Sequence, residues 1–133
     1  MGSFSDAIEL EILDHVFKVG AYTAATNLYV ALCTSTVLDS NTGTTIAGEV
    51  SGGAYARKKC NTWETATGGS LTNAIVLTFE QATADWGTIT HFAVCDHSST
   101  GAIIVHGAVN TAKNVGSGDT AKYATNSIKV SLT

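Results

Sequence analysis

Short runs of alternating apolar and polar residues, separated by turn residues, fill most of the chain after residue 20. Alternation with a period of two is typical of half-buried β-strands. No helical periodicity comes between the runs, which in practice excludes the βαβ units of a parallel sheet. The sequence therefore predicts a mainly β fold: an antiparallel β-sandwich or jelly-roll-like domain with one N-terminal amphipathic α-helix.

Seven or eight strands are expected from these runs. Residues 27–34 form a run that is apolar from Leu28 to Cys33, as in a central strand that is buried on both faces. Residues 88–95 and 102–109 flank a short polar turn and predict a hairpin. Further strands are expected at residues 54–62, 74–79, 121–123 and 127–132, a long loop at 35–47 and a turn region at 63–73.

Residues 3–18 predict the helix. Ser3 or Ser5 can cap its N-terminus. One apolar stripe recurs at i, i+4 and i+8, and further apolar residues widen it. The stripe consists of Ile8, Ile12 and Val16, widened by Leu10, Leu13 and Phe17. We expect this face to lie on a sheet or on a neighbouring subunit.

Composition limits the classes of partner. The 133 residues fit one domain, residues 1–133, with the helix at 3–18 and the sandwich at 27–133. Only 14% of residues are charged, which suits a surface that meets other proteins or simply a threonine-rich β domain. With a net charge of −4 and seven Lys or Arg residues, nucleic-acid binding is not expected. No apolar run approaches the roughly 20 residues that span a membrane, and no signal peptide is evident.

The sequence predicts no catalytic, cofactor or metal site. His91 and His106 lie in the hairpin strands and could face each other, and Cys95 and His97 add possible ligands. The regular spacing of zinc modules is missing, so solvated or hydrogen-bonded imidazoles are the preferred interpretation. Paired carboxylates on a rigid framework are also missing, and we predict that the protein is not an enzyme. The three cysteines are expected to be free and buried. They are Cys33, Cys60 and Cys95.

A small set of residues is predicted to contact a partner. Tyr55 and Arg57 share one side of their predicted strand, which is either a contact surface or an ordinary outer face. Trp86 is expected to cap the core, whereas Trp63 could cap the core or anchor an interface. The predicted interface residues are Tyr55, Arg57, Trp63, Ile8, Ile12 and Val16.

Residues 49–57 read Glu-Val-Ser-Gly-Gly-Ala-Tyr-Ala-Arg, and residues 82–92 read Ala-Thr-Ala-Asp-Trp-Gly-Thr-Ile-Thr-His-Phe. Both segments, together with Leu-Tyr-Val-Ala-Leu-Cys-Thr at 28–34, resemble those of small tailed-bacteriophage virion proteins, usually labelled tail-fibre or head-decoration proteins. The resemblance covers nearly the whole chain and brings no catalytic residues with it.

The resemblance implies a non-enzymatic virion component that is made in the bacterial host cytoplasm. Fibres normally contain a repetitive shaft or a trimerising coiled coil, and the sequence has no repeats or heptads. We therefore predict a capsid cement or decoration protein that binds the major capsid protein lattice and forms a homo-oligomer. The alternative is a tail or tail-fibre-associated protein involved in host attachment, for which exposed Trp63 or Tyr123 would supply a glycan-stacking surface.

Overall fold

The computed structural model describes residues 2–132 and confirms the mainly β fold with one N-terminal helix. The helix is α1 (Asp6–Val16). The strands are β1 (Gly2–Phe4), β2 (Tyr29–Cys33), β3 (Lys58–Lys59), β4 (Ser70–Thr72), β5 (Leu77–Gln81), β6 (Gly87–Cys95), β7 (Ile103–Val115), β8 (Thr120–Tyr123) and β9 (Lys129–Ser131).

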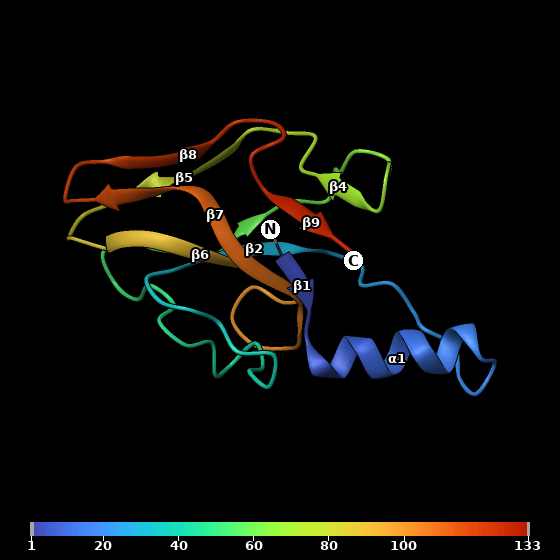
Figure 1. The fold of residues 1–133 in the computed structure, drawn as a ribbon. Helices are drawn as coiled ribbons and strands as arrows, with labels where there is room; N and C mark the ends of the chain where they lie inside the picture. Colours follow the sequence, from blue (N-terminus) through green and yellow to red (C-terminus); the bar gives the residue numbers. More distant parts are fainter. Residues whose placement is uncertain (1, 133) are drawn as a thin grey trace.

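The strands form two sheets. The larger has the order β3-β2-β6-β7-β1-β9-β4, and the smaller pairs β5 with β8. The pairings are antiparallel except between β1 and β9, which meet in parallel at Gly2 and Val130. The small sheet lies over β6 and the C-terminal half of β7, so the two sheets form the layers of a sandwich (Figure 1).

Strand β2 is buried on both faces, as predicted for residues 27–34, and so is the second half of β6, residues 92–95. One face packs against the small sheet in a core that includes Leu32, Phe92 and Phe79. The opposite face carries smaller residues, among them Ala31, Ala93 and Cys95. The long loop between β2 and β3 covers this second face with Val37 and Ile46. All three cysteines are free and buried, which confirms their predicted role as small apolar residues.

Several strand boundaries differ from the predicted ones. The hairpin of β6 and β7 is confirmed, but β7 continues to Val115 and pairs there with the start of β6. Only Lys58 and Lys59 form a strand within the predicted residues 54–62. The reason is that Gly52, Gly53 and Ala54 all have positive φ angles, 73°, 58° and 65°, which an extended strand does not accommodate. Strand β1 falls where the start of the helix was predicted, and β4 falls in the predicted turn region.

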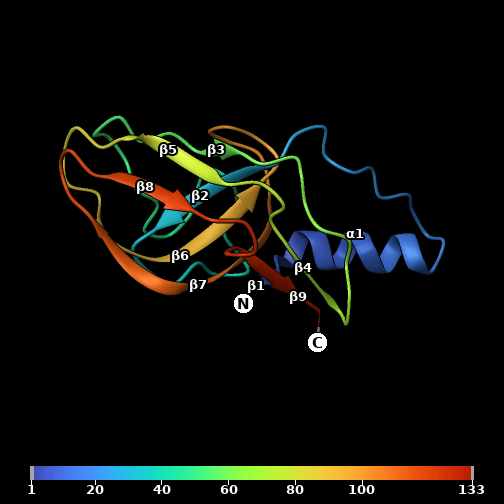
Figure 2. The same ribbon diagram turned by 90° about the horizontal axis from the view of Figure 1, so that it is seen from above.

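The helix begins at Asp6 instead of residue 3 because residues 2–4 pair with β7. Ser5 stands at the N-cap position, but its hydroxyl donates to the Ile103 carbonyl and does not cap the helix. Of the predicted stripe, Ile8 is buried, Ile12 is half-buried and Val16 is exposed. The helix extends away from the sheets, so most of its apolar face lies on neither sheet (Figures 1 and 2).

Candidate functional site

The segment of residues 49–57 runs between the long loop after β2 and strand β3, and it carries the most distinctive sequence motif of the chain. Tyr55 and Arg57 share one side of the segment, as the alternation predicted. This side faces the interior, whereas Ala54 and Ala56 are exposed. The expectation of an outer face for Tyr55 and Arg57 is therefore wrong, and the 8% exposure of Arg57 shows it most clearly.

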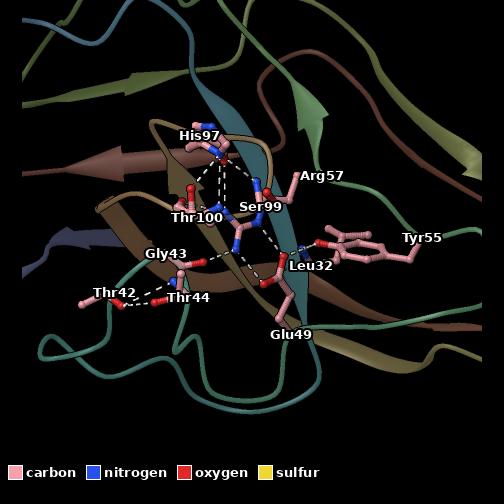
Figure 3. Close-up of polar contacts among 10 residues, drawn as sticks. All are labelled: Leu32, Thr42, Gly43, Thr44, Glu49, Tyr55, Arg57, His97, Ser99 and Thr100. Carbon is pink, nitrogen blue, oxygen red and sulfur yellow. Dashed lines mark hydrogen bonds and ion pairs between the residues drawn. The ribbon is translucent and has the colours of Figure 1, made fainter.

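Arg57 is the centre of a polar cluster that also includes Glu49, Tyr55, Gly43 and Thr100, which we call the Arg57 cluster (Figure 3). Its Nε donates to Glu49 Oε1 over 2.7 Å, and its Nη2 donates to Glu49 Oε2 over 2.8 Å. This is the bidentate geometry in which guanidinium–carboxylate bonds are strongest. The pair therefore fixes two ends of one nine-residue motif to each other.

The remaining donors of Arg57 reach two other loops. Nη2 donates to the Gly43 carbonyl in the loop between β2 and β3. Nη1 donates to the carbonyls of His97 and Thr100, at 3.0 and 3.3 Å, in the turn between β6 and β7. Arg57 thus connects its own segment to the loop at Gly43 and to the turn at His97 and Thr100. That turn lies 40 residues or more after Arg57 in the chain. The guanidinium suits this task because its five donors diverge in a rigid plane.

Burial and hydrogen bonding act in opposite directions on Arg57. Burial by itself lowers the pKa of the guanidinium, but its hydrogen bonds and charge interaction with Glu49 outweigh that effect and raise the pKa. Arg57 is thus held as a cation inside the protein.

Tyr55 extends the cluster into the sheet. Its hydroxyl donates to Glu49 Oε1 and accepts from the Leu32 backbone N–H, both over 3.0 Å. Burial and the nearby Glu49 carboxylate raise the pKa of this hydroxyl well above its usual range, so it stays neutral and serves as a hydrogen-bonding link. The ring meets Trp86 edge to face, with centroids 5.4 Å apart.

Two glycines allow the close approach of these segments. A Cβ atom at Gly43 would lie 2.1 Å from the Thr100 carbonyl oxygen, so no side chain fits between the loop and the turn. Gly53, with a φ of +58°, accepts a 2.9 Å hydrogen bond from Trp86 Nε1 at its carbonyl. Trp86 is only 5% exposed, which confirms its predicted place at the end of the core.

A surface hollow of about 380 Å³ lies beside the cluster. It is lined by Glu49, Tyr55, Arg57, Ser51, Ser98 and Ser99, among others. The polar groups of Glu49, Tyr55 and Arg57 bind one another, so they are occupied in holding the loops. The arrangement stabilises the shape of this surface.

The four histidines are placed apart. His91 stands opposite Ala108 and His106 opposite Ala93, so the two do not pair directly. His106 Nε2 lies 2.6 Å from Asp39 Oδ1, and His91 Nδ1 lies 2.8 Å from Thr90 Oγ1. Nδ1 of His97 and of His15 each meets a nearby backbone N–H. Within residues 2–132, no three His, Cys, Asp or Glu side chains gather closely enough to hold a metal ion.

The buried thiols also lie outside any reactive setting. Burial raises the pKa of both Cys33 and Cys95 to about 12, with the Glu49 carboxylate adding to the effect. A thiol with such a pKa is almost wholly protonated near neutral pH and is a poor nucleophile.

Trp63 and Tyr123, which the host-attachment alternative expects to be exposed, behave differently. Trp63 is half-buried against the core, and its Nε1 donates to the Cys60 carbonyl over 3.0 Å. Tyr123 is 3% exposed and packs against Phe79, so the prediction that it offers an exposed stacking surface is wrong. Its strand β8 belongs to the small sheet, and its ring points into the sandwich core.

Asn73 was not predicted to be important, although it is completely buried. Its Nδ2 donates to the carbonyls of Ile75 and Ala124, and its Oδ1 accepts from the Ile128 N–H. Little in the sequence predicts this, because an asparagine that follows Gly68 and Gly69 within a few residues is typical of a turn.

The segment that leads into β9 depends on this side chain, because Ile128 directly precedes β9. β9 pairs with the edge strand β4, so this end of the larger sheet depends on Asn73 as well.

Within residues 2–132 no helix has the length and apolar character that crossing a bilayer requires.

The comparison with known families covers almost the entire chain. Residues 3–131 match the family model described as Podophage GP4 fiber I protein gp80. No curated protein matches the chain. The match includes the Arg57 cluster, both sheets and α1. The chain therefore belongs to the Podophage GP4 fiber I protein gp80 family, a family of bacteriophage structural proteins.

Proposed function

We propose that the protein is a non-enzymatic structural subunit of the bacteriophage tail or tail fibre, with a role in host attachment. The family match over residues 3–131 is the observation that carries the proposal, because the family is described as a fiber protein. A role in the tail or tail fibre therefore replaces capsid cement as the preferred hypothesis.

The Arg57 cluster supports a structural role. A reactive site needs polar groups that are free to contact a substrate. Glu49, Tyr55 and Arg57 instead form hydrogen bonds with one another and with the backbone of two loops. The cluster fixes the loop after β2 and the β6–β7 turn against each other. A subunit that must withstand particle assembly benefits from loops held in one conformation, because less entropy is lost when they meet a neighbour.

Capsid decoration is the second candidate. The observation that favours it is the compact sandwich of residues 2–132, which contains no repeated shaft. In that role the partner would be the major capsid protein, and many copies would each add a modest contact to the shell. In either role we propose partners among the other virion proteins and assembly as a homo-oligomer.

Fractionated particles distinguish the two candidates. Purified virions would be separated into heads and tails, and the protein would be quantified by mass spectrometry in each fraction. We expect it in the tail fraction, and we expect particles that lack it to adsorb poorly to host cells while their heads remain stable. Recovery with the heads in hundreds of copies, with normal adsorption of the deletion particles, would reject the tail assignment in favour of decoration.

A further inference from the structure

The end of α1 and the residues that follow it present an apolar surface that nothing in residues 2–132 covers. Leu10, Leu13 and Phe17 are 66%, 54% and 72% exposed. Their spacing of i, i+3 and i+7 places them on one stripe of the helix. An 11-residue helix is shorter than the roughly 12–15 residues at which isolated helices become even marginally stable in water. Since only Ile8 is buried, the helix gains little from its own sheets.

A second apolar surface lies at the β4 end of the larger sheet. Two neighbouring hollows of about 240 and 120 Å³ share Phe4, Leu71 and Val130 as lining residues, and we call them together the β1–β9–β4 groove. Trp63 and Leu28 complete the larger hollow, and exposed Leu132 borders the smaller one. Among residues 2–132, no charged side chain lines either hollow.

We propose that α1 of one copy binds in the β1–β9–β4 groove of a second copy, with Phe17 as the anchor in the larger hollow. A cavity of about 150 Å³ admits a benzene molecule, so a hollow of about 240 Å³ has room for the Phe17 ring beside Trp63. The leucines of the stripe then lie along the smaller hollow. An aromatic side chain in an apolar pocket is the usual energetic centre of such contacts.

Charge favours the groove over a second, parallel helix as the partner of α1. Four of the eleven acidic residues of the chain lie on α1, at Asp6, Glu9, Glu11 and Asp14. Asp6 continues the stripe one turn before Leu10, so a parallel pair of α1 helices would bring two Asp6 carboxylates together. The groove offers the stripe an uncharged apolar lining instead. The apolar stripe of one copy and the apolar groove of the other would thus cover each other.

The contact is head-to-tail, because two different surfaces meet. Such contacts produce a closed ring when the rotation between copies closes, and a filament when it does not. The proposal concerns contacts between copies of this chain alone and does not depend on where the protein sits on the particle.

Analytical ultracentrifugation of the purified chain tests it with two variants and their mixture. Leu13→Glu combined with Phe17→Glu removes the helix surface, and Leu71→Glu removes the groove surface. We expect the wild type to form oligomers and each variant alone to be monomeric, with an apparent Kd at least tenfold weaker. An equimolar mixture of the two variants retains one intact helix and one intact groove, and we expect it to form a dimer.

Thr78→Glu combined with Ala112→Glu is the matched control, since both residues are exposed and lie away from both surfaces. It should assemble like the wild type. Leu71 is half-buried, so circular dichroism melting must show that its variant is folded; Trp63→Ala serves as a second groove variant. A wild-type chain that stays monomeric at millimolar concentration overturns the proposal. Groove variants that associate like the wild type, or a mixture that stays monomeric, also overturn it.

Discussion

Arg57 Nε lies 2.7 Å from Oε1 of Glu49, eight residues earlier in the chain, and the Arg57 side chain is only 3% exposed. The contrast with Lys58 and Glu80 is direct. That pair is 4.0 Å apart, with side chains 41% and 71% exposed. Removing one partner from a buried pair leaves a charge without compensation, whereas an exposed pair contributes little.

Replacing Arg57 with Met is therefore expected to lower the free energy of unfolding by about 2–4 kcal/mol, since Glu49 keeps some contact with water. Lys58→Met should change it by less than about 0.5 kcal/mol. Urea unfolding of both variants checks this. The double variant Glu49→Gln/Arg57→Met should lose less than the sum of the single losses. Equal effects at Arg57 and Lys58 would contradict the role assigned to the Arg57 cluster.

Two tyrosines provide a test in which the same substitution has different effects. The Tyr55 hydroxyl has two partners, while the buried Tyr123 hydroxyl has none among the described residues. Tyr55→Phe should destabilise the protein by about 1–3 kcal/mol because it leaves the Leu32 N–H unpaired. Tyr123→Phe should be neutral or slightly stabilising, because it removes a desolvated hydroxyl and keeps the ring. Thermal melting of the two variants side by side would show the difference, and a larger loss at Tyr123 would refute it.

Asn73 is expected to be one of the most sensitive polar positions. Asn73→Ala removes three hydrogen bonds to backbone groups and should cost about 3 kcal/mol. Asn110 is the natural control, because it is exposed and donates one bond to the Ser127 carbonyl. Asn110→Ala should cost less than about 1 kcal/mol. Hydrogen exchange should also show faster exchange of the Ile128 amide in the Asn73 variant, because that amide donates to Asn73 Oδ1. Unchanged protection of this amide would count against the role assigned to the Asn73 side chain.

Stability should fall in alkaline solution. Burial raises the pKa of Cys33 and Cys95 from 9.0 to about 12, so the folded state binds these protons more tightly than the unfolded chain. Their contribution is complete below pH 9 and is lost as the pH rises from 9 towards 12. Between pH 8 and 10.5 each thiol should cost about 1–2 kcal/mol. Urea unfolding at the two pH values measures this, and Cys95→Ala should show a smaller decrease than the wild type. An identical decrease in both proteins would show that other groups cause it.

Much of the fold was predictable from local patterns. The apolar run at 27–34 and the alternation at 88–95 identified β2 and β6, because a strand buried on one or both faces must place apolar residues at every second or every position. Trp86 was correctly placed in the core because Asp85 and Gly87 indicate a turn around it. The short strands β1 and β4 were missed, since three residues are too few to show a period.

The Arg57 cluster was only half predictable. The sequence by itself determined that Tyr55 and Arg57 lie on one side of their segment, because alternation depends only on neighbouring residues. The tertiary structure alone decided that this side faces inward, because that choice depends on the Gly43 and Thr100 carbonyls, which distant loops bring to the guanidinium. A period of two separates the two sides of a strand but carries no information on which side meets the core. The same limit applies to α1, whose apolar stripe was evident while the sheets left it uncovered.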